Sequence, residues 1–156
     1  GLAAVHEGWG VPVMADFCDE PATINALAAA AAGGADVVVG CRNMAGGGRE
    51  GGPAFKGLGS RAVSWVLHRL GGLPTRDATN AFKLYRTRLL HEMRPQEDGF
   101  AISVEMVVRA RAAGARIVDV PTLWRGRSAG ESKFRPTRLW WRYARWVLRS
   151  IADRFR

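Results

Sequence analysis

The chain has 156 residues, of which 47% are hydrophobic and 24% are charged. This length and composition favour one folded domain with a real core, and they exclude a disordered chain. No uninterrupted apolar run reaches the ~18 residues that a membrane-spanning helix needs, and no charged-then-apolar leader is visible. The net charge of +9 is concentrated near the C-terminus, because residues 125–156 hold 10 Lys and Arg against two acids.

Cys18 and Cys41 are the only cysteines, and they lie 23 positions apart. Neither has a second cysteine pair or a nearby histidine that would complete a metal site. Two isolated cysteines are typical of a protein in a reducing compartment. We therefore expect a cytoplasmic setting.

The first part of the chain alternates predicted helices and strands. We expect the end of a helix at residues 1–7, a strand over Val11–Ala15, an alanine-rich helix over Ala22–Ala32 and a buried strand over Ala35–Cys41. This β-α-β order predicts an α/β fold, Rossmann-like, with a mainly parallel sheet flanked by helices.

The second part is richer in predicted helices. A glycine-rich loop, Arg42–Pro53, is expected to remain irregular and leads into a helix over Ala54–Leu70. Further elements are predicted as helices at Thr87–Met93, Ile102–Ala113 and Thr137–Phe155 and as a strand at Arg116–Val120. We expect residues 1–136 to form one domain and residues 137–156 a basic, tryptophan-rich amphipathic helix.

The stretch VMADFCDEP places three carboxylates between an apolar run and a proline. Asp16 follows the predicted strand Val11–Ala15, and open α/β sheets bind ligands beyond the carboxyl ends of their strands. A carboxylate there favours Mg²⁺ or Mn²⁺, which bind through one or two carboxylates together with substrate phosphates. Glu20, directly before Pro21, favours the cap of a helix, whereas both roles stay open for Asp19.

Three other groups favour phosphate. Arg42 directly follows a predicted buried strand, and Lys56 and Ser60 are one helical turn apart near the start of a predicted helix, where backbone N–H groups attract anions. Arg127 and Lys133 lie at the two ends of the stretch RSAGESK, which suits two cations closing on a diphosphate. Each group alone is also typical of a solvated surface.

Five motifs in order, VMADFCDEP, ADVVVGCR, DATNAFKLYR, GARIVDVP and RSAGESK, resemble the family 2 glycosyltransferases that act on polyprenyl phosphates, the dolichyl-phosphate mannosyltransferase group. The resemblance covers Gly1 to about Lys133. It implies a GT-A fold and a nucleotide-sugar donor, typically GDP-mannose, used with Mg²⁺ or Mn²⁺. It also implies transfer of the sugar to dolichyl or another polyprenyl phosphate with inversion.

The resemblance implies roles for residues on the donor side. Asp16 matches the second acid of a D-x-D metal motif whose first acid is replaced by Met14, and Cys18 stands where a metal-side Gln or Ser is common. Arg127 and Lys133 match an R-x-x-G-E-S-K loop that closes on the donor diphosphate. The resemblance thus implies Asp16, Arg127 and Lys133 as catalytic residues.

On the acceptor side, the resemblance implies that Arg42, Lys56 and Ser60 bind the acceptor phosphate. Asp77 and Thr79 belong to a D-x-T-x-x-F element that lines the site. A phosphate monoester is largely a dianion at neutral pH, since its second pKa lies near ~6, and it needs no strong general base. This explains a site richer in Arg, Lys and Ser than in His.

The family begins with a nucleotide-binding half that carries a P-x-Y-N-E type motif, and no stretch of this chain matches it. The GT-A-like domain is therefore expected to be incomplete at the N-terminus. We expect little transfer from these 156 residues alone. Recognition of the base falls in the unmatched half, so the sequence leaves the sugar, the nucleotide and the polyprenyl acceptor open.

The C-terminal segment mixes arginine with tryptophan and supports more than one partner. Four arginines recur on one helical stripe, namely Arg138, Arg142, Arg145 and Arg149. Arginine with tryptophan suits a lipid headgroup layer, so we expect a peripheral position at the cytoplasmic membrane face. The alternatives are a basic nucleic-acid-binding module and a non-catalytic glycosyltransferase-like scaffold. Without a recognition motif, and with acids that would repel nucleic acid, we expect no nucleic-acid partner.

Overall fold

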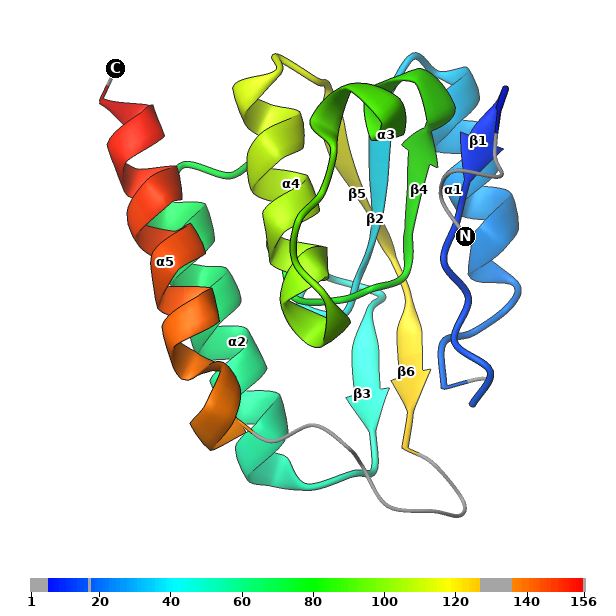
Figure 1. Ribbon diagram of the computed structural model, residues 1–156. Coiled ribbons are helices and arrows are strands. Elements are labelled where there is room, and N and C mark those ends of the chain that lie inside the picture. The colour runs from blue at the N-terminus through cyan, green and yellow to red at the C-terminus, as the bar shows by residue number, and fades with distance from the viewer. Residues whose placement is uncertain (1–5, 17, 127–135, 156) are drawn as a thin grey trace.

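The computed structural model describes residues 6–16, 18–126 and 136–155, of which residues 136–139 are described by their backbone alone. It shows an α/β fold in which helices cover both faces of a mixed sheet (Figure 1). The elements in chain order are β1 (Trp9–Gly10), α1 (Thr23–Ala32), β2 (Val37–Cys41), β3 (Gly48–Glu50), α2 (Ala54–Arg69), β4 (Lys83–Arg86), α3 (Thr87–Met93), α4 (Ile102–Ala112), β5 (Ile117–Pro121), β6 (Leu123–Arg125) and α5 (Pro136–Arg154).

The main sheet has the strand order β1-β4-β2-β5. Strands β2 and β5 are parallel, but β4 runs antiparallel to both β1 and β2. The expectation of a mainly parallel sheet is therefore wrong. The segment 71–82 returns the chain to the carboxyl end of β2, where the side-chain amide of Asn80 donates to the carbonyl of Gly40 at 2.8 Å, so β4 starts there and runs back along β2.

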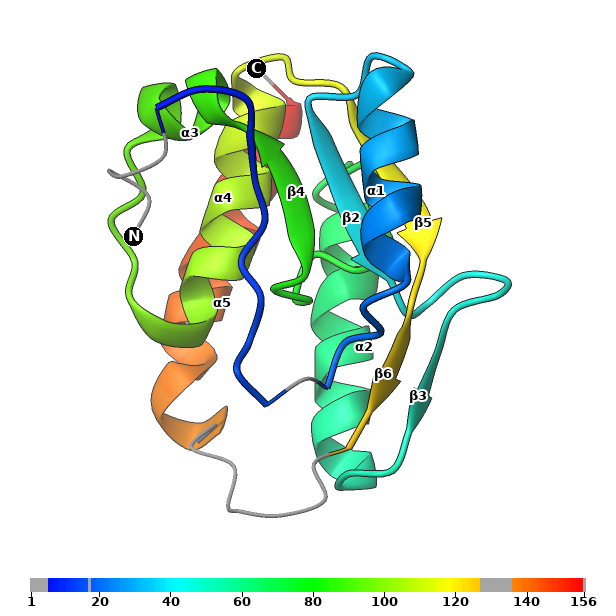
Figure 2. The same cartoon turned by 90° about the vertical axis from the view of Figure 1, so that its right-hand side faces the viewer.

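The helices divide the core into two parts. Helix α1 packs on one face of the sheet, whereas α2, α4 and α5 lie on the other (Figures 1 and 2). Strand β2 contributes to both parts, because successive side chains of a strand point to opposite faces. Val37 and Val39 join the core under α2, α4 and α5, and Val38 joins the core under α1. A strand buried on both faces explains the unbroken run of valines.

The five predicted helices and the strands that became β2 and β5 are confirmed, with bounds that differ by at most two residues. The strand predicted over Val11–Ala15 is wrong. The pairing with β4 involves Trp9 and Gly10 instead, and it does not extend far because Pro12 has no N–H to donate. Residues 1–5 of the predicted N-terminal helix end lie outside the described part, and His6 and Glu7 are not helical.

Besides β1, the three short strands β3, β6 and β4 are missing from the sequence-based expectation. One of them, β3, lies inside the glycine-rich loop that was expected to be irregular, where it pairs in parallel with β6 to form a second, two-stranded sheet. The third is β4 in the main sheet. Each is three or four residues long, too short for periodicity to reveal it.

Glu20 does not cap α1 with its side chain, so that prediction is wrong. The helix begins at Thr23, whose N–H donates to the backbone carbonyl of Glu20 at 3.0 Å, and no side-chain cap is present. The Glu20 carboxylate instead lies 3.5 Å from the guanidinium of Arg125 in β6. The cap position is Ala22, which is helical in conformation and has no side chain that could cap the helix.

Helix α5 is held on the domain by Glu97. The buried Glu97 carboxylate accepts a hydrogen bond from Nε1 of Trp146 at 2.9 Å and forms ion pairs with Arg142 and Arg145. The Trp146 ring belongs to the core. Two arginines of the predicted stripe are thus bonded to the protein's own carboxylate. Among the described residues, no helix has the length and apolar composition needed to cross a bilayer.

Candidate functional site

The centre of the site is an ion pair between Arg42 and Asp77. Arg42 follows β2, and its Nε and Nη2 donate to the two carboxylate oxygens of Asp77 at 2.7 and 2.8 Å. The backbone N–H of Arg42 also donates to Asp77, at 3.0 Å. The side chains are 11% and 0% exposed, so the alternative of a solvated loop arginine is wrong. A planar bidentate pair of this kind fixes the guanidinium in direction as well as in place.

Two hydroxyl groups complete this arrangement. Nη2 of Arg42 donates to the side-chain oxygens of Ser60 and Thr79, each at 3.3 Å, and these two oxygens lie 2.5 Å apart. Arg42, Ser60, Asp77 and Thr79 form what we call the Arg42 cluster. It joins the end of β2, the second turn of α2 and the segment before β4. The structure therefore brings together four residues that the resemblance assigns to one site.

Lys56 lies on α2 one helical turn before Ser60 and is half-buried. Its ammonium group is 5.9 Å from the centroid of the Phe55 ring. The predicted one-turn spacing of Lys56 and Ser60 on a helix is confirmed.

Both members of the ion pair are ionised. Burial alone would raise the pKa of Asp77, but the hydrogen bonds and the charge of Arg42 outweigh it and hold that pKa below its usual value. Burial likewise disfavours the charged guanidinium, and Asp77 reverses this and raises the pKa of Arg42. Each charge stabilises the other in a place from which water is largely excluded.

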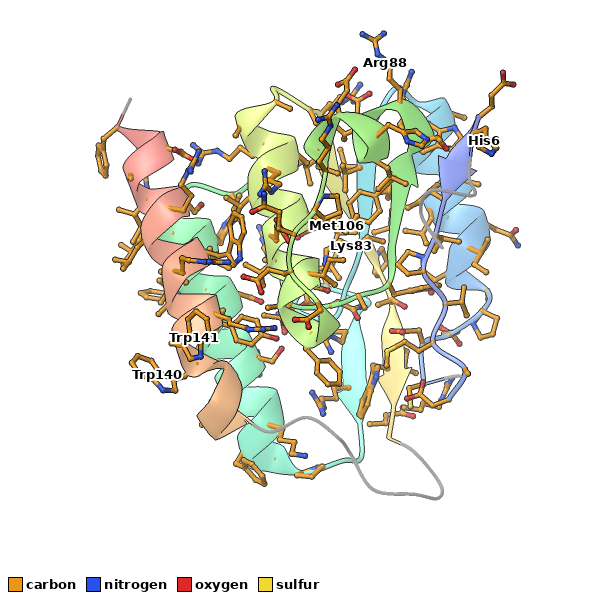
Figure 3. The ribbon with its side chains drawn as sticks, in the orientation of Figure 1. His6, Lys83, Arg88, Met106, Trp140 and Trp141 are labelled. Atoms are coloured by element: carbon orange, nitrogen blue, oxygen red, sulfur yellow. The ribbon has the colours of Figure 1, made fainter. Side chains whose placement is uncertain are left out.

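Lys83 in β4 is a buried cation that sequence analysis did not single out (Figure 3). Its ammonium group donates to the backbone carbonyls of Ala78 at 3.0 Å, of Asn80, and of Ser103 at 3.5 Å. Burial lowers its pKa to about 7, against the opposing charge of Asp77. Lys83 thereby ties the segment that carries Asp77 and Thr79 to the start of α4. The only signal in the sequence is one lysine inside the otherwise apolar run AFKLY.

Arg49 in β3 is a second cation that the sequence did not reveal. Its guanidinium lies 4.1 Å from the ring centroid of Trp124 in β6. Burial, together with the positive charge of Arg42, lowers the pKa of Arg49. Within the described part of the chain, Arg49 has no ion pair. The strand β3 that orients it lies in a segment expected to be irregular, so its direction could not be predicted.

The acidic stretch lies in the loop before α1. Oδ1 of Asp16 accepts the backbone N–H of Cys18 at 3.3 Å, and the Cys18 side chain is buried. Asp19 is buried as well, and its Oδ1 has no hydrogen-bond partner among the described residues. Burial raises the pKa of Asp19, and the negative charge of Asp16 adds to this, whereas Arg42 and Asn80 oppose it.

These carboxylates fit a divalent cation in a limited way. No group of three or more His, Cys, Asp or Glu side chains placed to hold a metal occurs in the described part of the chain. Mg²⁺ and Mn²⁺, however, bind through one or two carboxylates when substrate phosphates and water supply the other ligands. An orphaned, buried carboxylate oxygen beside a second carboxylate matches that requirement. A nearby cation would also favour the charged form of Asp19, against the burial that raises its pKa.

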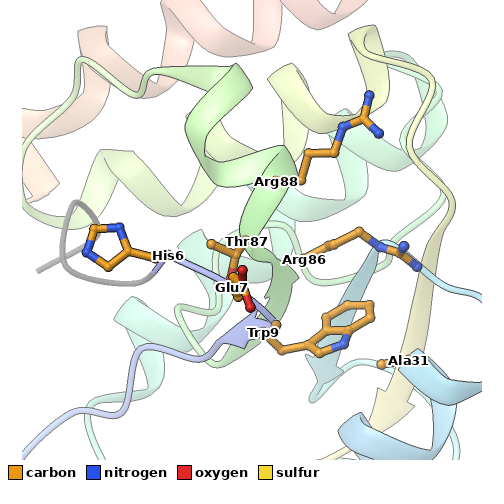
Figure 4. A pocket seen from close by; sticks show the side chains of 8 residues that line it. His6, Glu7, Trp9, Ala31, Arg86, Thr87 and Arg88 are labelled. Atoms are coloured by element: carbon orange, nitrogen blue, oxygen red, sulfur yellow. The ribbon is translucent and has the colours of Figure 1, made fainter.

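The remaining predicted residues fall elsewhere. Arg127 and Lys133 lie outside the described residues. Nδ1 of His68 lies 2.8 Å from the carbonyl oxygen of Leu73, which favours a structural role for this histidine. A hollow of about 520 Å³ opens near the start of α3, where it is lined by residues that include Trp9 and Arg86 (Figure 4). It contains none of the predicted site residues and lies at the opposite end of β4 from Lys83.

Comparison with known proteins supports a glycosyltransferase family, although no family model matches the chain. It is 32% identical over 102 residues to undecaprenyl-phosphate mannosyltransferase of Micrococcus luteus, which covers 64% of this chain and 42% of that protein. It is 26% identical over 152 residues to polyprenol monophosphomannose synthase of Mycolicibacterium smegmatis, and this match covers 94% of this chain and 57% of that protein. It is 34% identical over 103 residues to dolichyl-phosphate hexose transferase of Haloferax volcanii, and this match covers 66% of this chain and 43% of that protein.

The chain spans about half the length of the curated relatives it matches. The names of all three relatives specify a sugar transfer that involves a polyprenyl phosphate. The chain is thus similar to polyprenyl-phosphate glycosyltransferases.

Proposed function

We propose that the chain is the acceptor-binding part of a glycosyltransferase with a GT-A fold, which transfers mannose from GDP-mannose to dolichyl or another polyprenyl phosphate with inversion. The observation that carries this proposal is the Arg42 cluster, a buried and oriented cation at the carboxyl end of β2. The similarity to three polyprenyl-phosphate glycosyltransferases supports it. The expectation that transfer needs a nucleotide-binding half as well is part of the proposal.

Arg42 has a donor group left for a ligand. Its Nε and Nη2 are engaged by Asp77, Ser60 and Thr79, whereas its Nη1 makes no hydrogen bond to any described residue. A guanidinium held on one side by a carboxylate presents its other side in a fixed direction. In the proposal, Nη1 of Arg42 and the ammonium group of Lys56 bind the acceptor phosphate. Asp77 orients Arg42.

The reaction needs positioning more than proton transfer. The acceptor phosphate is largely a dianion at neutral pH, with a second pKa near ~6, so one of its oxygens can attack the anomeric carbon without a general base. The binding residues must hold that oxygen in line with the bond to the leaving group. Asp77 already balances the charge of Arg42, so Lys56 and Arg49 supply the surplus positive charge for a dianion.

On the donor side, Asp16 and Asp19 would hold Mg²⁺ or Mn²⁺ in this proposal, with Cys18 as a weaker neighbour. Bound there, the cation would neutralise charge that develops on the leaving diphosphate. Arg127 and Lys133 are proposed to close on the same diphosphate. The acidic stretch thus serves the donor diphosphate and the Arg42 cluster serves the acceptor phosphate, which explains why an acidic stretch persists in a basic protein.

The proposal is tested by titrating the chain with farnesyl phosphate, a short polyprenyl phosphate, and following binding by calorimetry. We expect Arg42→Lys to weaken binding by about tenfold, because it keeps the charge but loses the fixed fork. Arg61→Ala is the matched control, since Arg61 is an exposed arginine next to Ser60 on α2. Its affinity should stay within about twofold of the parent chain, as expected for a screened surface charge.

Calorimetry also tests the proposed metal site, and a transfer assay tests the use of the donor. Asp16→Asn should weaken Mn²⁺ binding while leaving the melting temperature and the farnesyl phosphate affinity unchanged. Equal losses for Arg42→Lys and Arg61→Ala would contradict the acceptor site, and unchanged Mn²⁺ binding in Asp16→Asn would contradict the metal site. Efficient mannose transfer from GDP-mannose by the chain alone would overturn the expected need for a nucleotide-binding half.

A further inference from the structure

The outward side of α2 carries a stripe of large apolar residues. Phe55, Leu58 and Trp65 recur at i, i+3 and i+10, which places them on one face of the helix. Their exposed fractions are 64%, 71% and 59%, although monomeric proteins rarely leave large apolar side chains contiguous on the surface. The inward side of α2 packs on the core through Leu67. The stripe therefore does not stabilise the fold of this chain.

Helix α5 has a similar stripe. Trp141, Leu148 and Phe155, the residue directly after the helix, recur every seven residues and are 50%, 67% and 79% exposed. The labelled rings of Trp140 and Trp141 lie on the side of α5 that faces away from the sheet (Figure 3). The opposite side of α5 is occupied by Trp146 and Ser150, which are buried. The tryptophans of this helix are thus divided between the core and the surface.

The two stripes belong to neighbouring helices that run in the same direction (Figures 1 and 2). The hydroxyl of Ser150 in α5 donates to the carbonyl of Gly71, just beyond α2, at 3.2 Å. Nη1 of Arg154 donates to the carbonyl of Arg69 at 2.6 Å. We call the two stripes together the aromatic face, made up of Phe55, Leu58, Trp65, Trp141, Leu148 and Phe155.

The charges that α2 carries beside the aromatic face are all positive. Helix α2 contains Lys56, Arg61 and Arg69 and no acidic residue. On α5, Arg145 and Arg149 flank the stripe and are ion-paired with Glu97 and with Asp153, the only acid in that helix. An apolar face bordered by cations matches the chemistry of a bilayer surface with anionic headgroups.

We propose that the aromatic face docks on the surface of a bilayer that contains anionic lipid. This inference rests on the proposed function, because a polyprenyl phosphate presents its phosphate at such a surface. It also has a geometric basis within α2. Phe55 and Leu58 alternate along the first turns of the helix with Lys56 and Ser60, which lie on its more buried side. Docking through the apolar side would hold the phosphate-binding side beside the headgroup layer.

Two other occupants fit the surface less well. A second copy of the chain would bring positive helix faces together, since α2 has no acidic residue and Asp153 of α5 already pairs with Arg149. A single-stranded nucleic acid would need stacking rings, but Trp146 is in the core and the face includes the aliphatic Leu58 and Leu148. A lipid surface, in contrast, can bury aliphatic and aromatic side chains equally well.

The test is flotation of the 156-residue chain with vesicles of phosphatidylcholine and about 30% phosphatidylglycerol, free of any polyprenyl lipid. The variant carries Phe55→Ser, Trp65→Ser, Trp141→Ser and Leu148→Ser. All four side chains are exposed, so the melting temperature should change little. We expect the variant to lower the vesicle-bound fraction by about tenfold, and high salt to weaken binding of the parent chain.

The matched control is Ile24→Ser, an exposed apolar residue on α1 at the other side of the sheet, which should float as the parent chain does. Equal flotation of the parent chain and the fourfold variant would overturn the inference. So would a dimer in sedimentation that the variant dissociates, or tighter binding to an oligonucleotide than to vesicles. Farnesyl phosphate binding is measured separately. Loss of vesicle binding alone would therefore count against the docking face, and loss of farnesyl phosphate binding alone would count against the acceptor site.

Discussion

Two carboxylates, Asp77 and Glu105, are both fully buried and both pair with an arginine. Glu105 in α4 accepts the backbone N–H groups of Gln96 and Glu97, at 2.9 and 2.6 Å, and Nε of Arg109 at 2.7 Å. Its bonds fix the chain between α3 and α4. A buried carboxylate therefore fixes the backbone of a loop at Glu105, whereas at Asp77 it orients a guanidinium.

The difference lies in what the partner of each carboxylate can still do. Arg109 is partly exposed, lies on the same helix as Glu105 at i+4, and completes a set of bonds that is closed within the protein. Arg42 comes from an element 35 positions away from Asp77 and keeps Nη1 without a partner among the described residues. A buried ion pair is weak support for stability by itself, since its desolvation opposes its attraction. An oriented donor without a partner among the described residues is what the proposed phosphate site requires.

The largest effect is expected from Asp77→Leu, which leaves the charge of Arg42 buried without a partner. It should lower the free energy of unfolding by about 3–5 kcal/mol, measured by urea denaturation. The double variant Arg42→Met/Asp77→Leu should recover a large part of that loss, because it buries no charge, yet it should bind no farnesyl phosphate. A double variant no more stable than Asp77→Leu would contradict this account of the pair.

Glu105→Ala should have a smaller effect, confined to stability. It orphans the N–H groups of Gln96 and Glu97, which costs about 2–3 kcal/mol, while the partly exposed Arg109 can return to water. Affinity for farnesyl phosphate should stay within about twofold of the parent value, because no bond of Glu105 reaches the Arg42 cluster. Glu105→Gln, which keeps one acceptor oxygen, should lose less. A large loss of affinity in folded Glu105→Ala would remove the distinction between the two carboxylates.

The sequence predicted the helices well because most of them are long and the pattern that indicates each one lies within its own residues. The Ala-rich α1 and the fully buried β2 have strong patterns of their own. In contrast, Val11–Ala15 has the composition of a strand but no partner, since pairing depends on β4, more than 60 positions later. Strands such as β4 exist because neighbours far along the chain supply their hydrogen bonds.

The same limit applies to the site. Arg42 could be placed at a sheet edge because it follows a recognisable strand, and Ser60 could be placed relative to Lys56 by helical spacing. That Asp77 pairs with Arg42 across 35 positions was beyond local pattern, and the motif resemblance alone drew attention to Asp77. Arg49 and Lys83 were missed because each owes its position to a short strand. Charges whose role depends on tertiary contacts are the part that sequence periodicity does not encode.

The smallest expected effect concerns Lys83, which holds the segment that carries Asp77. Its pKa is about 7 in the folded protein and 10.5 as a free side chain, so between these values the unfolded chain binds more protons. Stability should therefore rise with pH in that window, by about 2 kcal/mol from pH ~7 to pH ~9. The charged groups that face Lys83 are Asp77, Arg42, Asp119 and Asp19. They are shared with the control, so the comparison isolates the lysine.

The control is Lys83→Met, which keeps the length of the side chain but has no titrating group. Urea denaturation of both proteins at several pH values should give a difference in free energy of unfolding that grows in favour of the parent chain as pH rises. Below pH ~7 the ammonium group is charged in both states, so the difference should become flat there. A difference that stays constant from pH ~6 to ~9 would show that Lys83 keeps its proton throughout. The carbonyl groups of Ala78, Asn80 and Ser103 would then outweigh burial and fix the site segment with a permanent charge.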